Sequence, residues 1–397
     1  MTADLAPPSA TGDLLAELAT ALADLPDGDE SARTMLPAAA YTSPDVLAWE
    51  RRHLFAGTWT CVGREDELRA DGSQRAVVAG DVSVLLTWAD ETLRAFANTC
   101  RHRGHELLSE GAGTDRHSVV CPYHAWTYDL AGALRAAPGF RDVDGFESGA
   151  HSLVELAVQR WHGWVFVHAL HPLEAGSLSP RTVPFARHVG ALDQIVAPYA
   201  PGSLLLADRH SYEVAANWKV IVENYHECYH CPLIHPELCQ VSPPNSGENY
   251  DGEPGAWVGG SMDLRDDMAT MSLTGEPAGP PIPGVDPRRV EYVQLWPNLL
   301  ISAHPDYVMT HRLVPLAPDR SWVECSWYVP GTGPENARAV EFWDLTNRQD
   351  WTACESVQRG LSSPHFQPGP FAPNEDAVRE FVTMVARGYQ GRALHEA

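Results

Sequence analysis

The chain has 397 residues and a net formal charge of −24, and Lys219 is the single lysine among its 28 lysines and arginines. A chain this acidic is a poor candidate for a nucleic-acid-binding protein, because phosphate contacts need clustered cations. At about 100 to 200 residues per domain, the length suggests two or three domains. The hydrophobic content of 44% and charged content of 20% are typical of a soluble globular protein.

The cysteine content limits the class of protein further. Eight cysteines are too few for a disulfide scaffold, and several lie close to histidines, which indicates metal binding in a reducing compartment. No stretch approaches about 18 consecutive apolar residues, so we expect no membrane span. The opening Met-Thr-Ala-Asp has no cationic start and no apolar core, and we therefore expect no secretory signal and a cytoplasmic protein.

The first third of the chain contains two helix signals and then a β-rich region. Leucines recur at helical spacing between residues 11 and 25, and Ser43-Pro44 is typical of a helix start that runs on to Phe55. From Trp59 to Ala169 short β-rich runs alternate with Gly and Asp turns, with cysteines in the turns. This pattern predicts a helical arm followed by a small β domain.

The rest of the chain mixes strands and helices. The segment 208–216 predicts a strand and 218–230 a helix, whereas the many Pro and Gly residues of 243–288 favour a long loop or lid over a pocket. The remaining predicted elements are strands near 292–296, 299–303, 307–313 and 322–328 and helices near 336–359 and 374–387.

Two cysteine and histidine pairs form a first candidate metal site. Eighteen residues separate Cys100-Arg-His102 from Cys121-Pro-Tyr-His124. Two thiolates and two imidazoles can bind zinc or a mixed-ligand [2Fe-2S] cluster, and the residue types alone leave both open. The single residue between Cys100 and His102 disfavours zinc, because structural zinc sites usually place two to four residues between ligands.

A second candidate site lies in the segment 217–235. If residues 218–230 are one helix, Glu223, Glu227 and His230 share a face at i, i+4 and i+7, and Pro232 ends the helix just before His235. Two histidines and one carboxylate form the facial triad that holds Fe(II), because three ligands on one side leave the other side for O2 and substrate.

Three neighbouring residues allow other interpretations. His226 lies four residues before His230 and could pair with it on a helix, while Cys228 and Cys231 form a Cys-x2-Cys that is also typical of zinc or redox sites. In a reducing cytoplasm we expect both cysteines to be buried packing thiols.

Both sites together resemble the α subunits of Rieske non-haem iron oxygenases, and the resemblance runs from about Leu36 to about Phe381. It implies that Cys100 and Cys121 bind one iron of a Rieske [2Fe-2S] cluster and that His102 and His124 bind the other. It also implies that His230, His235 and Asp350 bind a mononuclear Fe(II). Asp350 lies in the segment 347–361, and Asp344 and Glu355 are the alternative carboxylates for the third ligand.

The resemblance also implies an α+β fold. We expect residues 1–55 to be a helical arm that packs on the catalytic domain and 56–170 to be a small all-β Rieske domain. Residues 171–397 would be the catalytic domain, with a curved antiparallel sheet and helices in a helix-grip (START-like) arrangement and a lid at about 243–288.

The family uses an external electron source and several subunits. The resemblance implies a flavin and iron-sulfur reductase or a ferredoxin as partner, NAD(P)H as the indirect electron donor, and a homotrimer or a dimer of trimers. His124 of one subunit would then contact Glu227 of its neighbour, and Glu227 would connect to His230. Glu227 and Asn224 are therefore assigned catalytic roles.

The sequence around the second site indicates a class of substrate. Glu227 stands where many ring-oxidising relatives have Asp, and with the segment 355–361 it looks most like the glycine betaine, choline and carnitine monooxygenases. The chain would then hydroxylate an N-methyl or adjacent C–H group, with demethylation and formaldehyde as the outcome. Methylated cations bind aromatic faces, and Trp257, Tyr292 and Trp296 are the candidate cage residues.

Other functions are kept as alternatives. One is a Rieske oxygenase that acts on an aromatic or natural-product substrate, and another is a non-catalytic zinc-binding or electron-carrier protein. No cysteine lies between residues 100 and 121 to form the extra disulfide of high-potential Rieske proteins, so we expect a low potential. Four arginines near the cluster motif are expected to dock the acidic redox partner, namely Arg101, Arg103, Arg116 and Arg135.

Overall fold

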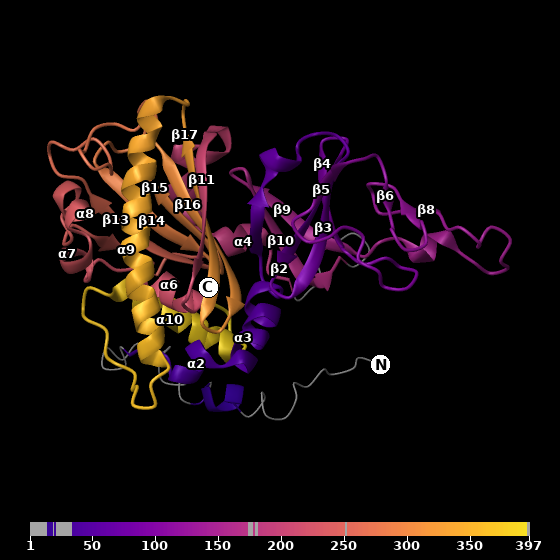
Figure 1. Ribbon diagram of the computed structural model, residues 1–397, viewed down its shortest axis with the longest axis horizontal. Coiled ribbons are helices and arrows are strands. Elements are labelled where there is room, and N and C mark those ends of the chain that lie inside the picture. Colours follow the sequence, from indigo (N-terminus) through magenta and orange to yellow (C-terminus); the bar gives the residue numbers. More distant parts are fainter. Residues whose placement is uncertain are drawn as a thin grey trace. The chain divides into compact units, whose positions relative to one another are not determined.

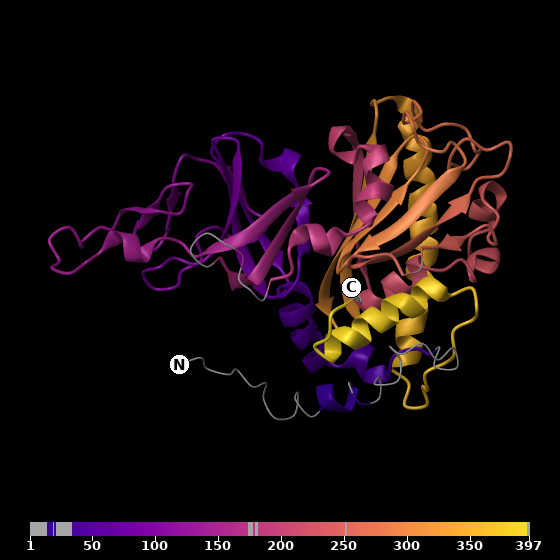
Figure 2. The ribbon, with the colours of Figure 1, turned by 180° about the vertical axis from the view of Figure 1, so that it is seen from behind.

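The computed structural model describes residues 14–18, 20, 34–173, 178, 182–250 and 252–394. They form two compact units, drawn in Figures 1 and 2. The smaller unit is Glu50–Phe185, and the larger combines the chain up to Trp49 with the chain from Ala186 onward. The sequence pattern predicts these boundaries near residues 55 and 170. None of the helices in the described part of the chain has the length and hydropathy that a bilayer crossing requires.

The smaller unit contains two antiparallel sheets, as the β-rich pattern predicted. Their strand orders are β1-β10-β9-β4-β3-β2-β5 and β6-β7-β8. The turn between β3 and β4 shows how local sequence sets this fold, because Asp90 and Glu91 have φ values of 50° and 57°, as a two-residue hairpin turn requires. The strands are β1 (Thr60–Arg64), β2 (Ser73–Ala79), β3 (Val82–Ala89), β4 (Thr92–Ala97), β5 (Gly113–Asp115), β6 (Val119–Val120), β7 (Thr127–Tyr128), β8 (Leu134–Ala136), β9 (Glu155–Trp161) and β10 (Trp164–Pro172).

The larger unit is built on one curved antiparallel sheet with the order β11-β17-β16-β15-β14-β13-β12. The long helix α9 (Ala337–Leu361) crosses this sheet, as Figure 1 shows. The predicted α+β fold, with a curved antiparallel sheet and helices, is confirmed. The strands are β11 (Leu205–Val214), β12 (Glu248–Asn249), β13 (Trp257–Asp263), β14 (Arg289–Leu295), β15 (Leu299–Ala303), β16 (Val308–Ala317) and β17 (Arg320–Val329).

The helices of the larger unit bury one face each. In α9 the buried side chains include Phe342, Trp343 and Thr346 and recur every three or four residues, the spacing of one helix face. Helix α3 begins at the predicted Ser43-Pro44, where the backbone N–H of Val46 donates to the Ser43 hydroxyl at 3.4 Å. The other helices are α2 (Ala38–Thr42), α3 (Pro44–Glu50), α4 (Phe185–Val189), α5 (Leu192–Val196), α6 (Trp218–Tyr225), α7 (Cys231–Ile234), α8 (Pro236–Val241) and α10 (Asp376–Tyr389).

The prediction of one helix over 218–230 is wrong. Helix α6 ends at Tyr225, and α7 begins only at Cys231. Between them the Glu227 carboxylate accepts hydrogen bonds from the backbone N–H groups of Tyr229 and His230, which offers this segment an alternative to helical bonding. Pro232 lies in the first turn of α7, where its missing N–H costs nothing, and so it starts a helix rather than ending one.

The predicted loop at 243–288 needs correction, and the predicted helix at 11–25 lies only partly within the described residues. The segment 243–288 is not all loop, because it contains β13, which pairs with β14 in the main sheet. Gly259 of β13 serves close strand packing, since a Cβ there would lie 2.3 Å from the Tyr292 carbonyl oxygen. In the predicted 11–25 helix, residues 14–18 are helical with Leu15 and Leu18 buried, whereas 21–25 lie outside the described residues.

Candidate metal centres

Two loops with the same backbone geometry carry the four predicted cluster ligands. One lies between β4 and β5 and the other between β6 and β7. In each, the cysteine N–H donates to the carbonyl five residues later, and the N–H four residues later donates back to the cysteine carbonyl. The bonds are Cys100 to His105 at 2.8 Å, Gly104 to Cys100 at 3.0 Å, Cys121 to Trp126 at 2.8 Å and Ala125 to Cys121 at 3.0 Å.

The side chains of these loops converge on one point. The His102 and His124 ring centroids are 4.7 Å apart, and Cys100 and Cys121 are each 2% exposed. His102 stacks on the Trp126 ring at 4.9 Å, which fixes the direction of its imidazole. Its Nδ1 atom is buried and has no hydrogen-bond partner within the described residues. A buried polar atom without a partner is costly, and a metal would satisfy this one.

Burial and hydrogen bonds both act on the two thiols. Burial raises the pKa of the Cys121 thiol, the backbone N–H groups of Tyr123 and His124 lower it, and the neighbouring Cys100 raises it again, with a net increase. The Tyr128 hydroxyl lies 3.4 Å from Cys100 Sγ. Two thiols and two imidazoles on facing loops fit a [2Fe-2S] cluster with mixed ligands, which needs two donors of each kind.

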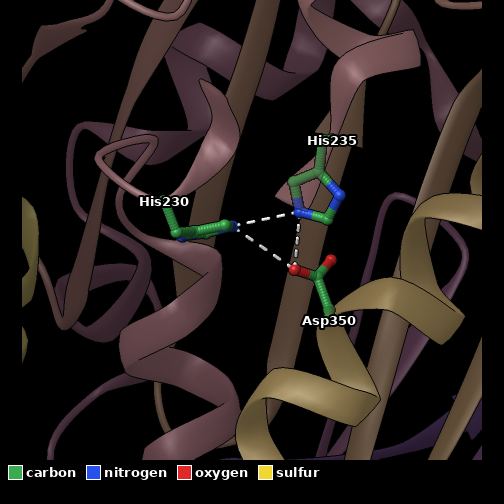
Figure 3. Close-up of side chains that lie close together, drawn as sticks. All are labelled: His230, His235 and Asp350. Atoms are coloured by element: carbon green, nitrogen blue, oxygen red, sulfur yellow. Dashed lines mark hydrogen bonds and ion pairs between the residues drawn. The ribbon is translucent and has the colours of Figure 1, made fainter. Parts of the chain in front are cut away.

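A second group of ligand atoms lies in the larger unit, drawn in Figure 3. His230 and His235 Nε2 are 3.1 Å apart, and one Asp350 oxygen lies 2.8 Å from His235 Nε2 and 3.4 Å from His230 Nε2. Of the described residues, these three form the one group of His, Cys, Asp and Glu whose ligand atoms all lie within 4.8 Å of one another. This donor set fits Fe(II) held by two histidines and one carboxylate.

Short helices and one long helix place these three side chains. His230 precedes α7 and His235 lies between α7 and α8, while Asp350 comes from the middle of α9. Burial lowers the pKa of His230, but hydrogen bonds to Asp350 and Glu227 outweigh it and raise it to about 9. Burial raises the pKa of Asp350, and the hydrogen bonds from both histidines more than reverse this. The negative charges of Asp350 and Glu227, which favour a protonated His230, would also favour a metal cation at this position.

Of the other candidate residues in this segment, two adjoin His230 and two lie away from it. Glu227 contacts His230 Nδ1 through one carboxylate oxygen, and Asn224 Nδ2 lies 3.5 Å from His230 Nε2, so both adjoin the ligand group. Glu223 lies away from it and accepts a hydrogen bond from the Tyr41 hydroxyl at 2.7 Å. His226 is buried and contacts Gln294 at 3.2 Å rather than His230.

The two alternative carboxylates are bound elsewhere. Asp344 accepts a hydrogen bond from the Tyr212 hydroxyl at 2.6 Å and pairs with Arg348 at 2.8 Å. Glu355 accepts a hydrogen bond from the backbone N–H of Ala215 at 3.2 Å. Neither belongs to the ligand group, which leaves Asp350 as the carboxylate that the structure brings to the two histidines.

The prediction that Cys228 and Cys231 are free packing thiols is wrong. The two residues form a disulfide, with their Cα atoms 4.9 Å apart. Cys228 lies in the break between α6 and α7, and Cys231 is the first residue of α7. The disulfide lies between Glu227 and His235 in sequence, and both cysteines line the cavity at the iron site.

A cavity of about 440 Å³ opens beside His230, His235 and Asp350. Of the three predicted cage residues, Tyr292 lines it, whereas Trp257 and Trp296 do not. Trp257 is 2% exposed and packs near Tyr250, and Trp296 is fully buried between Trp218 and Phe381. Both belong to the core, as large apolar side chains usually do.

Sequence reasoning missed two aromatic residues of this cavity, Tyr225 and Trp343. The Tyr292 ring is perpendicular to both, with centroid distances of 6.1 Å to Tyr225 and 6.2 Å to Trp343. Helical spacing could have identified Trp343, because it lies seven residues before Asp350 on the same face of α9. Tyr225 is the last residue of α6 and adjoins the predicted Asn224.

Comparison with known families agrees with both centres. Residues 58–147 match the Rieske [2Fe-2S] domain, and residues 202–391 match the catalytic domain of the ring-hydroxylating alpha subunit. The first match covers both cluster loops, and the second covers His230, His235 and Asp350. The family match therefore favours the iron-sulfur cluster over zinc.

Whole-chain comparisons show the same relationship. The glycine betaine monooxygenase oxygenase subunit of Chromohalobacter salexigens is 31% identical over 97% of this chain and 93% of its own. The carnitine monooxygenase oxygenase subunit of Acinetobacter pittii is 39% identical over 50% of this chain and 52% of its own. The quaternary ammonium Rieske monooxygenase CntA in complex with L-carnitine is 25% identical, with a TM-score of 0.73 over 90% of this chain and 96% of its own. The chain is an enzyme of the Rieske non-haem iron oxygenase family, with a [2Fe-2S] cluster and a mononuclear iron as its cofactors.

Proposed function

We propose that the chain is an oxygenase component that hydroxylates an N-methyl or adjacent C–H group of a glycine betaine-like quaternary ammonium compound. In this proposal Cys100, Cys121, His102 and His124 hold the cluster, and His230, His235 and Asp350 hold the iron. Glycine betaine and carnitine monooxygenase subunits among the relatives support this substrate class.

The observation that carries the proposal is the aromatic wall of the cavity beside the iron site. Tyr225, Tyr292 and Trp343 present three rings, and each ring that a methylated cation contacts contributes about 0.5 to 2 kcal/mol. Besides Glu227, which contacts His230, and Asp350, a proposed iron ligand, the described lining includes the acidic Asp376. Aromatic faces and negative charge both favour a quaternary ammonium group over a neutral ring.

The residues around the iron site have separable roles. When bound, the iron supplies O2 activation with electrons from the cluster, and its three protein ligands leave the opposite side open. The Glu227 carboxylate accepts a hydrogen bond from Nδ1–H of His230 and so turns the Nε2 lone pair toward the metal position. The aromatic wall holds the cation and keeps water from the reacting C–H group. Hydroxylation of an N-methyl carbon gives an N-hydroxymethyl group, which breaks its C–N bond and loses a proton to release formaldehyde and the demethylated amine.

We further propose how electrons arrive. A flavin and iron-sulfur reductase or a ferredoxin, supplied by NAD(P)H, would reduce the cluster, and His124 of the partner subunit would contact Glu227 within a homotrimer or a dimer of trimers. The structure report on CntA describes inter-subunit electron transfer for that enzyme. The exposed Arg101 and Arg103 beside the cluster offer the reductase a cationic surface.

A substrate panel with a surrogate reductase tests this function. Glycine betaine, choline, carnitine and a set of aromatic acids would each be incubated with NADH and O2, and formaldehyde and NADH use would be measured. We expect formaldehyde in near-equal amount to the NADH consumed for a quaternary ammonium substrate alone. Coupled turnover restricted to aromatic or natural-product substrates would overturn the proposed substrate class.

A further inference from the structure

The two histidines of the iron site have different hydrogen-bond partners at Nδ1, the ring nitrogen that does not face the metal position. His230 Nδ1 contacts the Glu227 carboxylate directly. His235 Nδ1 instead lies 2.7 Å from the side-chain oxygen of Gln349. A carboxylate thus orients one imidazole and a neutral amide orients the other. His235 is also the more buried of the two, with 2% of its side chain exposed against 17% for His230.

A second contact determines which way the Gln349 amide points. Its Nε2 donates to a carboxylate oxygen of Glu237 at 3.2 Å. A carboxylate accepts hydrogen bonds and an amide nitrogen donates them, so the nitrogen must face Glu237. The amide oxygen is therefore turned toward His235, where it can only accept a hydrogen bond.

The orientation of the amide fixes the protonation of the imidazole. Because the Gln349 oxygen accepts, His235 must carry its proton on Nδ1 and expose the lone pair of Nε2. That Nε2 atom is the one 2.8 Å from Asp350 and 3.1 Å from His230 Nε2. The chain from Glu237 through Gln349 to His235 thus prepares the nitrogen that faces the metal position.

The hydrogen bonds from Glu237 through Gln349 to His235 link two helices. Glu237 lies in the first turn of α8, two residues after His235. Gln349 lies on α9 next to Asp350. One hydrogen-bonded path therefore connects the two helices that supply His235 and Asp350. A change in the distance between α8 and α9 would alter both ligands together.

We propose that Gln349 is a positioning residue of the iron site and that Glu237 orients it. The inference rests on the proposed ligand set of His230, His235 and Asp350, and it adds to that set the amide that fixes the tautomer of His235. Partners of this kind behind a metal-bound histidine typically change metal affinity by about 10- to 100-fold when they are removed.

Fe(II) affinity provides the test. The apoprotein of the iron site, with its cluster intact, would be titrated anaerobically with Fe(II) against a competing chelator, and the ferrous site would be examined by EPR of its nitric oxide adduct. The variants are Gln349→Leu, Gln349→Glu, and the exchange Gln349→Glu with Glu237→Gln. The matched control is Gln240→Leu, the same change at an exposed position of α8.

We expect Gln349→Leu to weaken Fe(II) binding by about 10- to 100-fold and to change the EPR line shape, while Gln240→Leu leaves both unchanged. Gln349→Glu alone places two carboxylates together and weakens binding, because like charges repel. The exchange variant restores one acceptor and one donor, and we expect its affinity to return to within about threefold of the wild type. A rescue of this kind requires the hydrogen-bond polarity itself and would not follow from packing alone.

His235→Ala separates failure of this inference from failure of the proposed ligand set. If His235→Ala abolishes Fe(II) binding but Gln349→Leu binds within twofold of the wild type, the role of Gln349 is refuted and the ligand set stands. If His235→Ala binds Fe(II) normally, the ligand set itself is wrong. An exchange variant no better than Gln349→Glu alone would also refute the proposed hydrogen-bond chain.

Discussion

The cluster loops and the iron site bring metal-binding side chains together in different ways. The four cluster residues lie within one short stretch of sequence, on two loops that repeat the same backbone hydrogen bonds. The iron site joins a local pair, His230 and His235, to Asp350, which lies 115 residues beyond His235. The first site depends on local structure, whereas the second depends on the packing of α9 onto the rest of the larger unit.

This difference means that the two centres can be perturbed one at a time. The cluster loops belong to the unit Glu50–Phe185, and every iron-site residue belongs to the other unit. Variants in the larger unit should therefore leave the visible spectrum of the cluster intact. Substitutions in each unit test this independence.

Removal of the distant carboxylate should have the largest effect. We expect Asp350→Ala to lose the mononuclear iron and more than about 100-fold of the activity, since ligand loss should exceed the effect of removing a residue behind a ligand. Iron analysis and product assays would measure this, with cluster absorbance unchanged. Asp344→Ala on the same helix is the control and should retain iron. Loss of iron in the control but not in Asp350→Ala would reverse the ligand assignment.

The iron-site unit should also respond to pH through Glu223. Burial raises its pKa from 4.5 to about 7, although the Tyr41 hydroxyl and Lys219 oppose this. The folded state then holds a proton that the unfolded state releases above pH 4.5, so stability falls as pH rises from 4.5 to about 7. The cost reaches up to about 3 kcal/mol, at about 1.4 kcal/mol per pKa unit.

Glu223→Gln tests this pH dependence because it removes the titrating group and keeps an oxygen for Tyr41. We expect the variant to gain stability relative to the wild type as pH increases across this window. Hydrogen exchange at α6, compared between the two proteins at each pH, would measure the difference. A constant difference from pH 4 to pH 8 would contradict the raised pKa.

Removal of the proposed electron bridge should uncouple the two centres without removing either. With Fe(II) in excess, so that weakened metal binding is masked, we expect Glu227→Ala to retain both metals and to lose about 10- to 100-fold of coupled turnover, because Glu227 orients His230 and would contact His124 of the partner subunit. Metal analysis alongside NADH-driven product formation would establish this. Normal product formation by the variant would eliminate the bridge.

Reduction of the cluster should depend modestly on its exposed arginines. We expect Arg101→Gln with Arg103→Gln to slow cluster reduction by about 3- to 10-fold at low salt and to leave substrate binding unchanged, because surface charges act mainly on association rates. Stopped-flow absorbance of the cluster would follow this. Arg135→Gln should have less effect, since Arg135 already pairs with Asp129 at 2.6 Å. Equal reduction rates at every salt concentration would exclude a docking role.

The same contrast explains what the sequence could predict. Local patterns pointed to the candidate cluster residues, the β-rich unit and the start of α3, because each depends on spacing within a few residues. Asp350 could be named only through resemblance to a family, since no local pattern connects it to His230. The predicted helix was longer than α6 because the Glu227 carboxylate accepts hydrogen bonds from the backbone N–H groups of Tyr229 and His230. The spacing of apolar residues gives no information about a side-chain hydrogen bond of this kind. The core positions of Trp257 and Trp296 likewise depend on tertiary packing.

Metal content and EPR of the purified wild-type chain test the two-centre account most directly. We expect about three iron atoms and two acid-labile sulfides per chain, because a [2Fe-2S] cluster and one mononuclear iron are both present. Reduction should give the EPR signal of a cluster with mixed ligands, and nitric oxide should give a separate ferrous signal that Asp350→Ala removes. A colourless zinc protein, or a cluster without any nitric oxide signal, would contradict the account.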